Sequence, residues 1–244
     1  MIKTYVINLE TSKERKAYMD DVLKDLSTLD VEYVKAVDGR KMSLEEKNKY
    51  FDIKKFKERN SIEVRDGEIG CTLSHQKCYR KIVEENIPYA LILEDDIEIC
   101  GDLNKAISSV CGYLMTEEPT VILLSGWFWY ISKKIISDNY RLATVYSAFL
   151  THSYLINNSA AKLLIEKRPY IVADDWTYIK NKGVKIKAIL PHIINQKNDG
   201  IESTITFFRE KKVKSLLWRL KNARNIIFTK ILKLIGNFEK PSLR

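Results

Sequence analysis

Short apolar runs alternate along residues 1–206 with longer segments in which apolar residues recur at helical spacing. The short runs predict strands at residues 3–8, 31–37, 90–93, 120–124, 143–150 and 184–189. The longer segments predict helices at residues 11–26, 71–85, 159–166 and 175–181, and a short helix after Ser43. A charged stretch over residues 52–68 is expected to be mobile. This alternation predicts an α/β fold with an open, mostly parallel sheet flanked by helices, in which ligands bind beyond the carboxyl ends of the strands.

The C-terminal segment, residues 207–244, follows a different pattern, in which apolar residues at helical spacing alternate with Lys and Arg. Its apolar positions are Val213, Leu216, Leu217, Leu220, Ile227, Ile231 and Leu234. The segment holds eleven basic and two acidic residues, which accounts for the whole formal net charge of +9. We therefore expect a domain over residues 1–206 and a basic amphipathic helical tail over residues 207–244. Such a helix binds an anionic membrane surface or packs on its own domain, and the pattern slightly favours the membrane.

Several classes of protein find no support in the sequence. The basic tail lacks a nucleic-acid-binding motif, so we expect no nucleic-acid partner. No Gly-rich loop follows the first predicted strand, and the four cysteines form no Cys-x-x-Cys pair. No apolar run approaches the roughly 20 residues of a membrane-spanning helix, and the N-terminus lacks a signal-peptide pattern. We expect a cytoplasmic protein that is peripheral on the inner face of the cytoplasmic membrane.

Three adjacent carboxylates, Glu94, Asp95 and Asp96, directly follow the apolar run at residues 90–93. Unpaired charges at the end of a buried strand are costly, so these groups need a compensating partner. A divalent cation, Mn²⁺ or Mg²⁺, prefers oxygen ligands and can also bind a substrate diphosphate. If the strand continues, Glu94 and Asp96 face one side and Asp95 the other. Taken alone, the pattern is more typical of the solvated start of a loop than of a metal site, and it is also compatible with a phosphoacceptor site.

The acidic run is one of several blocks that are spaced along the chain. They are YVINLETSKERK (5–16), VKAVDGR (34–40), GEIGCTLSH (67–75), LILEDDI (91–97), SYLINNSAAKLL (153–164), ADDW (173–176) and PHIINQ (191–196) followed by ST. In this order and spacing, the blocks resemble glycosyltransferase family 25, the family of lipooligosaccharide galactosyltransferases, which is related to the collagen galactosyltransferases. The resemblance extends from residue 2 to about residue 205 and leaves out the tail.

The resemblance implies a GT-A-like nucleotide-binding fold, a UDP-sugar donor, most often UDP-galactose, a divalent cation, and transfer with inversion. By analogy, the acidic run is the counterpart of an Asp-x-Asp motif. Asp96 is then the expected direct metal ligand, with Glu94 and His192 as further candidates. Either Glu94 or Asp95 faces the ribose or a metal-bound water. The residues expected to bind the donor are Asn8, Leu9, Arg15, Asp38, Gly39, Gly70, Ser74, His75, Glu94 and Asp95.

Inversion requires a base that removes the proton from the acceptor hydroxyl. Asp175 and Asp174 are the candidates, with Asp175 narrowly favoured, and whichever does not act can cap the helix that follows. Trp176 would offer a sugar ring an apolar face, and Trp127 and Gln196 are expected on the acceptor side. His152 has no supporting context.

The expected function is that of an inverting, metal-dependent galactosyltransferase. Its acceptor would be a lipid-linked oligosaccharide, the glycan of a lipooligosaccharide or lipopolysaccharide. Two alternatives stay open at this point. One is a transferase that uses UDP-glucose or a UDP-N-acetylhexosamine, because the choice of sugar depends on one or two contacts. The other is a nucleotide-binding module without turnover.

Overall fold

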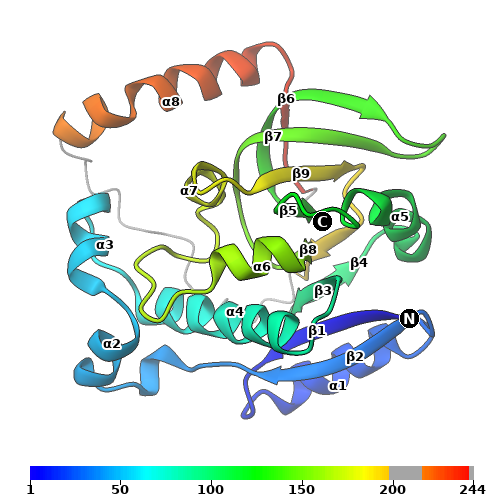
Figure 1. The fold of residues 1–244 in the computed structure, drawn as a ribbon, viewed down its shortest axis with the longest axis horizontal. Helices are drawn as coiled ribbons and strands as arrows, with labels where there is room; N and C mark the ends of the chain where they lie inside the picture. Colours follow the sequence, from blue (N-terminus) through cyan, green and yellow to red (C-terminus); the bar gives the residue numbers. More distant parts are fainter. Residues whose placement is uncertain (198–215, 242–244) are drawn as a thin grey trace.

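A nine-stranded mixed sheet extends through the protein, with helices on both of its faces (Figure 1). The computed structural model describes residues 1–197 and 216–241. The strand order is β11-β6-β7-β9-β5-β8-β3-β1-β2, and β4 and β10 form a separate two-stranded sheet. The strands are β1 (Ile2–Asn8), β2 (Leu29–Lys35), β3 (Tyr89–Glu94), β4 (Ile97–Ile99), β5 (Thr120–Leu123), β6 (Trp127–Ile135), β7 (Arg141–Phe149), β8 (Ser153–Asn157), β9 (Lys185–Leu190), β10 (Ile194–Gln196) and β11 (Phe238–Glu239).

The α/β class is confirmed, but the sheet is mixed rather than mostly parallel. Strand β1 is parallel to β2 and β3, and β5 is parallel to β9. Strand β8 lies between β3 and β5 and is antiparallel to both, while β6 and β7 form an antiparallel hairpin. The sequence did not predict β6 or β8. The end of β6 is exposed and polar, and β8 is short and leads directly into a helix, so neither has a clear pattern of its own.

Helices cover both faces of the sheet. They are α1 (Lys13–Leu23), α2 (Leu44–Tyr50), α3 (Ile53–Asn60), α4 (Asp66–Glu84), α5 (Leu103–Val110), α6 (Asn158–Leu164), α7 (Trp176–Asn181) and α8 (Leu216–Leu234). Buried residues of α4, α6 and α7 share one hydrophobic core with the sheet, and those of α1 and α5 share the core on the other face. Burial of the apolar residues in both cores holds the central strands in place, and the strands in turn position the loops at their ends.

The charged stretch at residues 52–68, which was expected to be mobile, forms α3 and the first residues of α4. The Asp52 carboxylate accepts a hydrogen bond from the Lys55 backbone at 3.1 Å and caps α3. Phe56 is buried in a small core with Phe51 and Ile69. The prediction was wrong because one well-placed Phe on a charged helix gives no clear periodicity, yet it anchors the segment.

The tail contains the predicted helix, α8, followed by the edge strand β11. Strand β11 pairs antiparallel with β6, so the end of the tail is part of the large sheet. The expected boundary between residues 206 and 207, and Val213 of the helical pattern, lie outside the described residues. Within residues 1–197 and 216–241, no helix is long and apolar enough to cross a membrane.

A contact between two glycines joins the loop after β2 to α4. A Cβ atom added to Gly70 would lie 2.3 Å from the Val37 carbonyl oxygen and 2.7 Å from the Gly39 nitrogen. The Ser74 hydroxyl supports the same contact, because it accepts a hydrogen bond from the Val37 amide at 2.8 Å and donates one to the Gly70 carbonyl at 2.7 Å. Any side chain at Gly70 would separate this loop from α4.

We therefore expect Gly70→Ala to destabilise the protein, although Ala is normally favoured over Gly inside a helix by about 1 kcal/mol. Overpacking against backbone atoms should outweigh that gain and lower the free energy of unfolding by about 2 kcal/mol. Unfolding in urea, monitored by circular dichroism, measures this free energy of unfolding. Gly112→Ala is the matched control, because nothing lies within 4 Å of a Cβ there. A Gly70→Ala protein as stable as this control would contradict the expected close contact.

Candidate active site

A cavity of about 670 Å³ lies at the carboxyl ends of β1, β2 and β3. This is where open α/β sheets bind ligands, and the volume is in the usual range of about 300–1,000 Å³ for small-molecule sites. The cavity is lined by twelve of the residues that the sequence selected: Leu9, Arg15, Asp38, Gly39, Ser74, His75, Glu94, Asp95, Asp96, Trp127, Asp174 and Gln196. The remaining five, Asn8, Gly70, Asp175, Trp176 and His192, are not among its lining residues.

The three consecutive carboxylates all line the cavity, because β3 ends at Glu94 and Asp95 and Asp96 form a turn. The expected alternation of sides therefore does not apply. Asp95 is buried and compensated by two partners. It accepts a hydrogen bond from the Asn8 amide at 2.7 Å and pairs with the Arg15 guanidinium at 2.9 Å. Asn8 thus holds Asp95 in place by a hydrogen bond, although Asn8 does not itself line the cavity.

Asp96 is less well compensated than Asp95. Its Oδ2 accepts a hydrogen bond from Gln196 at 3.0 Å and lies 3.4 Å from Arg15. Its Oδ1 is buried and has no hydrogen-bond partner among the described residues. Burial, with the negative charge of Glu94 as the next cause, raises the pKa of Asp96 to about 6. An unpaired carboxylate oxygen in a cavity of acids fits a cation ligand.

Glu94 lies between two polar groups on the opposite side of the turn. It accepts a hydrogen bond from the Thr151 hydroxyl at 2.6 Å, and His75 Nε2 is 3.6 Å from its Oε1. Burial alone would raise the pKa of Glu94, but His75 and Thr151 together lower it. His75 Nδ1 is 2.7 Å from the Tyr154 hydroxyl, which fixes the ring, and Nε2 has no hydrogen-bond partner among the described residues.

Several of these groups can hold a metal ion. Glu94 and Asp96 supply carboxylate oxygens, and His75 supplies a buried nitrogen that points into the same cavity. One cluster in the described part of the chain has three ligand atoms within 4.8 Å of one another, from Cys71, His75 and Glu94. Asp96 is not part of that cluster. The donor set therefore fits a divalent cation, with Glu94 and His75 common to both arrangements.

Asp174 and Asp175 have separate roles in the structure. Asp175 caps α7 by accepting a hydrogen bond from the Tyr178 amide at 3.0 Å, and it pairs with Arg59 at 2.7 Å. Asp174 lines the cavity, and burial, together with the charges of Glu68 and Asp175, raises its pKa to about 6. A group with that pKa is mostly ionised at neutral pH and able to accept a proton. The geometry favours Asp174, not Asp175, as the base.

Trp176 is buried and His192 is half-buried, and neither lines the cavity, although the sequence predicted a functional role for both. Trp176 is only 1% exposed and donates its indole N–H to the Leu150 carbonyl at 2.7 Å, so it has no free face for a sugar. This prediction was wrong because residue 176 is the first residue of α7 and faces the sheet. The His192 ring packs against Phe128, with ring centroids 5.4 Å apart, and burial lowers its pKa to about 4.

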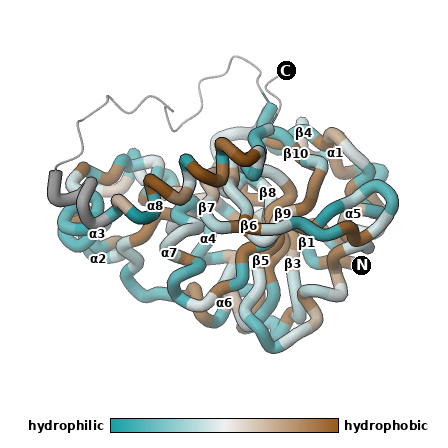
Figure 2. Tube along the Cα trace, turned by 90° about the horizontal axis from the view of Figure 1, so that it is seen from above, coloured by the Kyte–Doolittle hydropathy of each residue, from teal (hydrophilic) through white to brown (hydrophobic). Residues whose placement is uncertain are grey.

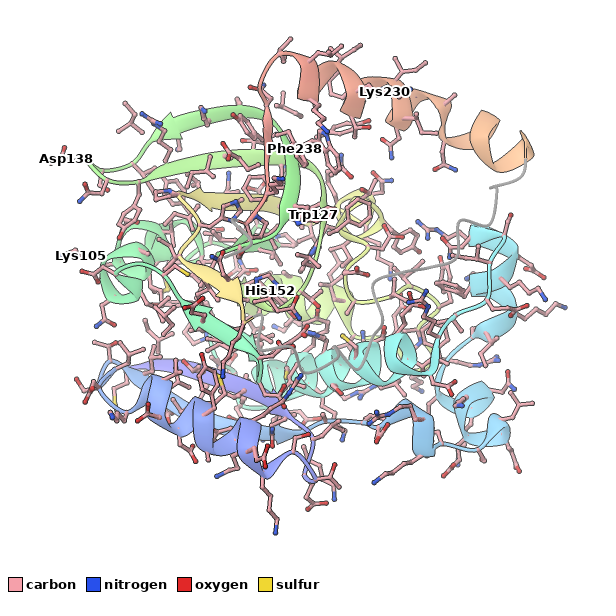
Figure 3. The ribbon with its side chains drawn as sticks, turned by 180° about the vertical axis from the view of Figure 1, so that it is seen from behind. Lys105, Trp127, Asp138, His152, Lys230 and Phe238 are labelled. Atoms are coloured by element: carbon pink, nitrogen blue, oxygen red, sulfur yellow. The ribbon has the colours of Figure 1, made fainter. Side chains whose placement is uncertain are left out.

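An aromatic wall, formed by Trp127, Trp129 and Phe149, lines the end of the cavity opposite α4. Trp127 is 39% exposed and can contact a ligand, as the sequence predicted. Trp129 packs on Phe149 and on Phe238 of β11, with ring centroids 6.1 and 4.7 Å apart. Strand β11 places Phe238 opposite Trp129 of β6, two residues from Trp127, and Figure 3 labels both Trp127 and Phe238. Aromatic faces of this kind bind the apolar face of sugar rings.

Sequence reasoning missed several lining residues. Cys71, Thr151 and His152 line the cavity, and Figure 3 places His152 in the middle of the molecule. Arg40 and Arg65 also line the cavity, and the Arg40 guanidinium pairs with Asp38 at 2.8 Å. Cys71 lies in a block that had been selected, one helical turn before His75, and this spacing was the available signal. Thr151 and His152 lie in a loop without any pattern, so only the fold brings them to the site.

Comparisons with known proteins give a consistent family. A family model described as glycosyltransferase family 25 (LPS biosynthesis protein) matches residues 1–178. A glycosyltransferase 25 family member from Aedes aegypti is 28% identical over 222 residues, which is 86% of this chain and 33% of that protein. One from Anopheles gambiae is 30% identical over 186 residues, or 68% of this chain and 28% of that protein. The chain thus spans about a third of the length of these relatives.

Solved structures show only a distant likeness. The crystal structure of A197 from STIV covers 85% of this chain with 12% identity and a TM-score of 0.41. A similarity at this level does not identify a family, and the family assignment depends on the sequence. Because the family model covers well over half of the residues, the chain belongs to glycosyltransferase family 25.

Proposed function

We propose that the protein is an inverting glycosyltransferase that moves galactose from UDP-galactose to the glycan of a lipooligosaccharide or lipopolysaccharide. The observation that carries the proposal is the single cavity in which the acidic turn and Asp174 are both present. Family membership supports the transfer of a sugar. The donor and acceptor follow from the resemblance of the sequence blocks, and a lipid-linked oligosaccharide is the acceptor class that we propose.

The side chains divide the cavity into a donor side and an acceptor side. Leu9, Asp38 and Gly39, at the ends of β1 and β2, would receive the nucleoside, and Arg15 would face the diphosphate. A divalent cation, Mn²⁺ or Mg²⁺, would supply charge neutralisation of the leaving UDP when it is bound. Asp96 and Glu94 would hold it, and we propose His75 as the nitrogen ligand, since His192 is outside the cavity.

The reaction requires one proton transfer and one displacement. Asp174 removes the proton from the acceptor hydroxyl, whose oxygen then attacks the anomeric carbon from the face opposite the diphosphate. The bond between the anomeric carbon and the diphosphate oxygen breaks, and UDP leaves with the electron pair. The aromatic wall, with Trp127 exposed, holds the acceptor sugar in the orientation of attack.

UDP release from a panel of UDP-sugars tests this function. We expect slow hydrolysis of UDP-galactose in Mn²⁺, little from UDP-glucose or UDP-N-acetylhexosamines, and none in EDTA. Calorimetric binding of UDP is measured in parallel. If another UDP-sugar is hydrolysed faster, the galactose assignment is wrong while the transferase assignment stands. If UDP neither binds nor is released, the function as a UDP-sugar transferase is refuted.

A further inference from the structure

Helix α8 packs on the β6–β7 side of the sheet through one face only (Figure 1). Asn225 accepts a hydrogen bond from the Tyr146 hydroxyl, and the Phe228 and Tyr146 rings are 4.6 Å apart. Leu232, one turn further, is buried. Because residues 225, 228, 229 and 232 share one side of a helix, the opposite side of α8 faces away from the domain.

The outward side of α8 carries a continuous apolar surface. Ile227, Ile231 and Leu234 of α8, and Ile235 directly after it, are between 46% and 85% exposed and follow each other at intervals of four, three and one residues. We call these four residues the outer stripe. Figure 2 shows α8 in front of the sheet, with hydrophobic and hydrophilic segments along its length. Scattered exposed apolar residues are common, but four in one stripe indicate a binding surface.

Basic residues surround the outer stripe. Arg224, Lys230 and Lys233 are exposed on α8, and Figure 3 shows Lys230 on the side of the molecule away from Trp127. The sequence of α8 contains no Asp or Glu, so no acid within the helix neutralises this charge. Two copies of such a helix would repel each other. An apolar stripe flanked by uncompensated cations is complementary to a surface that is both anionic and apolar below its charges.

We propose that α8 docks through the outer stripe on an anionic lipid bilayer, with its axis parallel to the membrane plane. The stripe enters the boundary between headgroups and acyl chains, and Arg224, Lys230 and Lys233 contact lipid phosphates. This mode of binding needs no membrane-spanning segment. The outer stripe is exposed and does not take part in the packing of α8 on the domain, whereas Lys233 also lies over the Phe238 ring, 5.2 Å from its centroid.

The docked helix is connected directly to the candidate active site. Residues 235–237 join α8 to β11, where Phe238 packs on Trp129 of the aromatic wall. Docking therefore holds the acceptor end of the cavity beside the bilayer. This consequence depends on the proposed function, since only a lipid-linked acceptor benefits from it. The binding of α8 to lipid does not depend on the proposed function.

Co-sedimentation of the full chain with vesicles tests the docking surface. We expect the protein to bind phosphatidylglycerol vesicles at least about tenfold more tightly than phosphatidylcholine vesicles, and to be released by high salt. The double variant Ile227→Asp, Ile231→Asp should lose this binding. Leu44→Asp is the matched control, because Leu44 is 70% exposed on α2, far from α8 (Figure 1), and this variant should bind as the wild type does.

Hydrolysis of the soluble UDP-sugar, measured without vesicles, separates this proposal from the proposed function. The stripe variant should keep the wild-type rate of UDP release and its circular dichroism spectrum. Equal vesicle binding by the wild type and the stripe variant would overturn the proposal. So would a wild-type dimer that dissociates on the same substitutions without any vesicle binding, because the occupant would then be a second copy. Vesicle binding without UDP release would uphold the docking surface and refute only the transferase.

Discussion

The Asp174→Asn protein is expected to lose about 10³-fold in the rate of sugar transfer while becoming more stable than the wild type at pH 7.5. Both effects have one origin. Asp174 lines the cavity and is the base that we propose, and burial together with the charges of Glu68 and Asp175 raises its pKa to about 6. Above that pH the ionised group is held in an unfavourable environment, so removing its charge favours the folded state.

The direction of the stability effect depends on pH. The folded-state pKa of Asp174 is above its ordinary value of 3.8, so the folded protein binds more protons between pH 4 and about 6. This group therefore makes the wild type less stable as pH rises through that window. The free energy of unfolding of Asp174→Asn should equal that of the wild type below this pH window and should be larger by about 1–3 kcal/mol above it. In thermal unfolding at pH 7.5, this difference would raise the Tm of the variant above that of the wild type by roughly 2–10 °C.

The catalytic effect has its own pH dependence. If Asp174 is the base, the wild-type rate of transfer should rise with pH through about 6, because the base acts only when it is ionised. Asp175→Asn is the matched control. Asn also caps helices well, so this variant should keep most of the activity, although it loses the ion pair with Arg59 and removes one of the charges that raise the pKa of Asp174. Greater loss of activity in Asp175→Asn than in Asp174→Asn would return the role of base to Asp175.

The part of the site that the sequence predicted lies at the ends of continuous apolar strands. β1, β2 and β3 were all recognisable, and parallel strands bring their carboxyl ends to one edge. Polar residues just after them, such as Asp38 and Glu94, therefore had to meet. The prediction of Asp96 as a metal ligand stays a prediction, and its unpartnered oxygen agrees with it.

The part that the sequence could not predict depends on contacts between distant segments. Nothing local distinguishes Trp176, which is buried, from Trp127, which is exposed on the cavity wall. The same holds for His192 and His152, of which only His152 lines the cavity. In neither pair does the hydrophobic pattern around the residue show whether its ring is buried or lines the cavity. The packing of α7 and of the loop between β7 and β8 against the sheet decides the environments of Trp176 and His152, and β8, which follows that loop, had no clear pattern of its own.

The Asp96→Asn protein should lose the response to Mn²⁺ that we expect of the wild type. With Mn²⁺ at about 100 times its dissociation constant at pH 7.5, a bound cation would stabilise the folded wild type by about 2.7 kcal/mol. This corresponds to a rise in Tm of roughly 5–10 °C. Asn keeps the shape of Asp and still accepts the hydrogen bond from Gln196, so the fold should be intact. It removes the negative oxygen that has no partner among the described residues.

Asp95→Asn is the comparison that makes this test specific. Asp95 is already compensated by Asn8 and Arg15, so its replacement should leave most of the Mn²⁺ response while lowering stability without metal. Transfer by Asp96→Asn should fall by about 100-fold or more. If Asp96→Asn instead gains as much stability from Mn²⁺ as the wild type, the cation binds elsewhere. The cluster of Cys71, His75 and Glu94 is then the place to look, and Cys71→Ser should abolish the response.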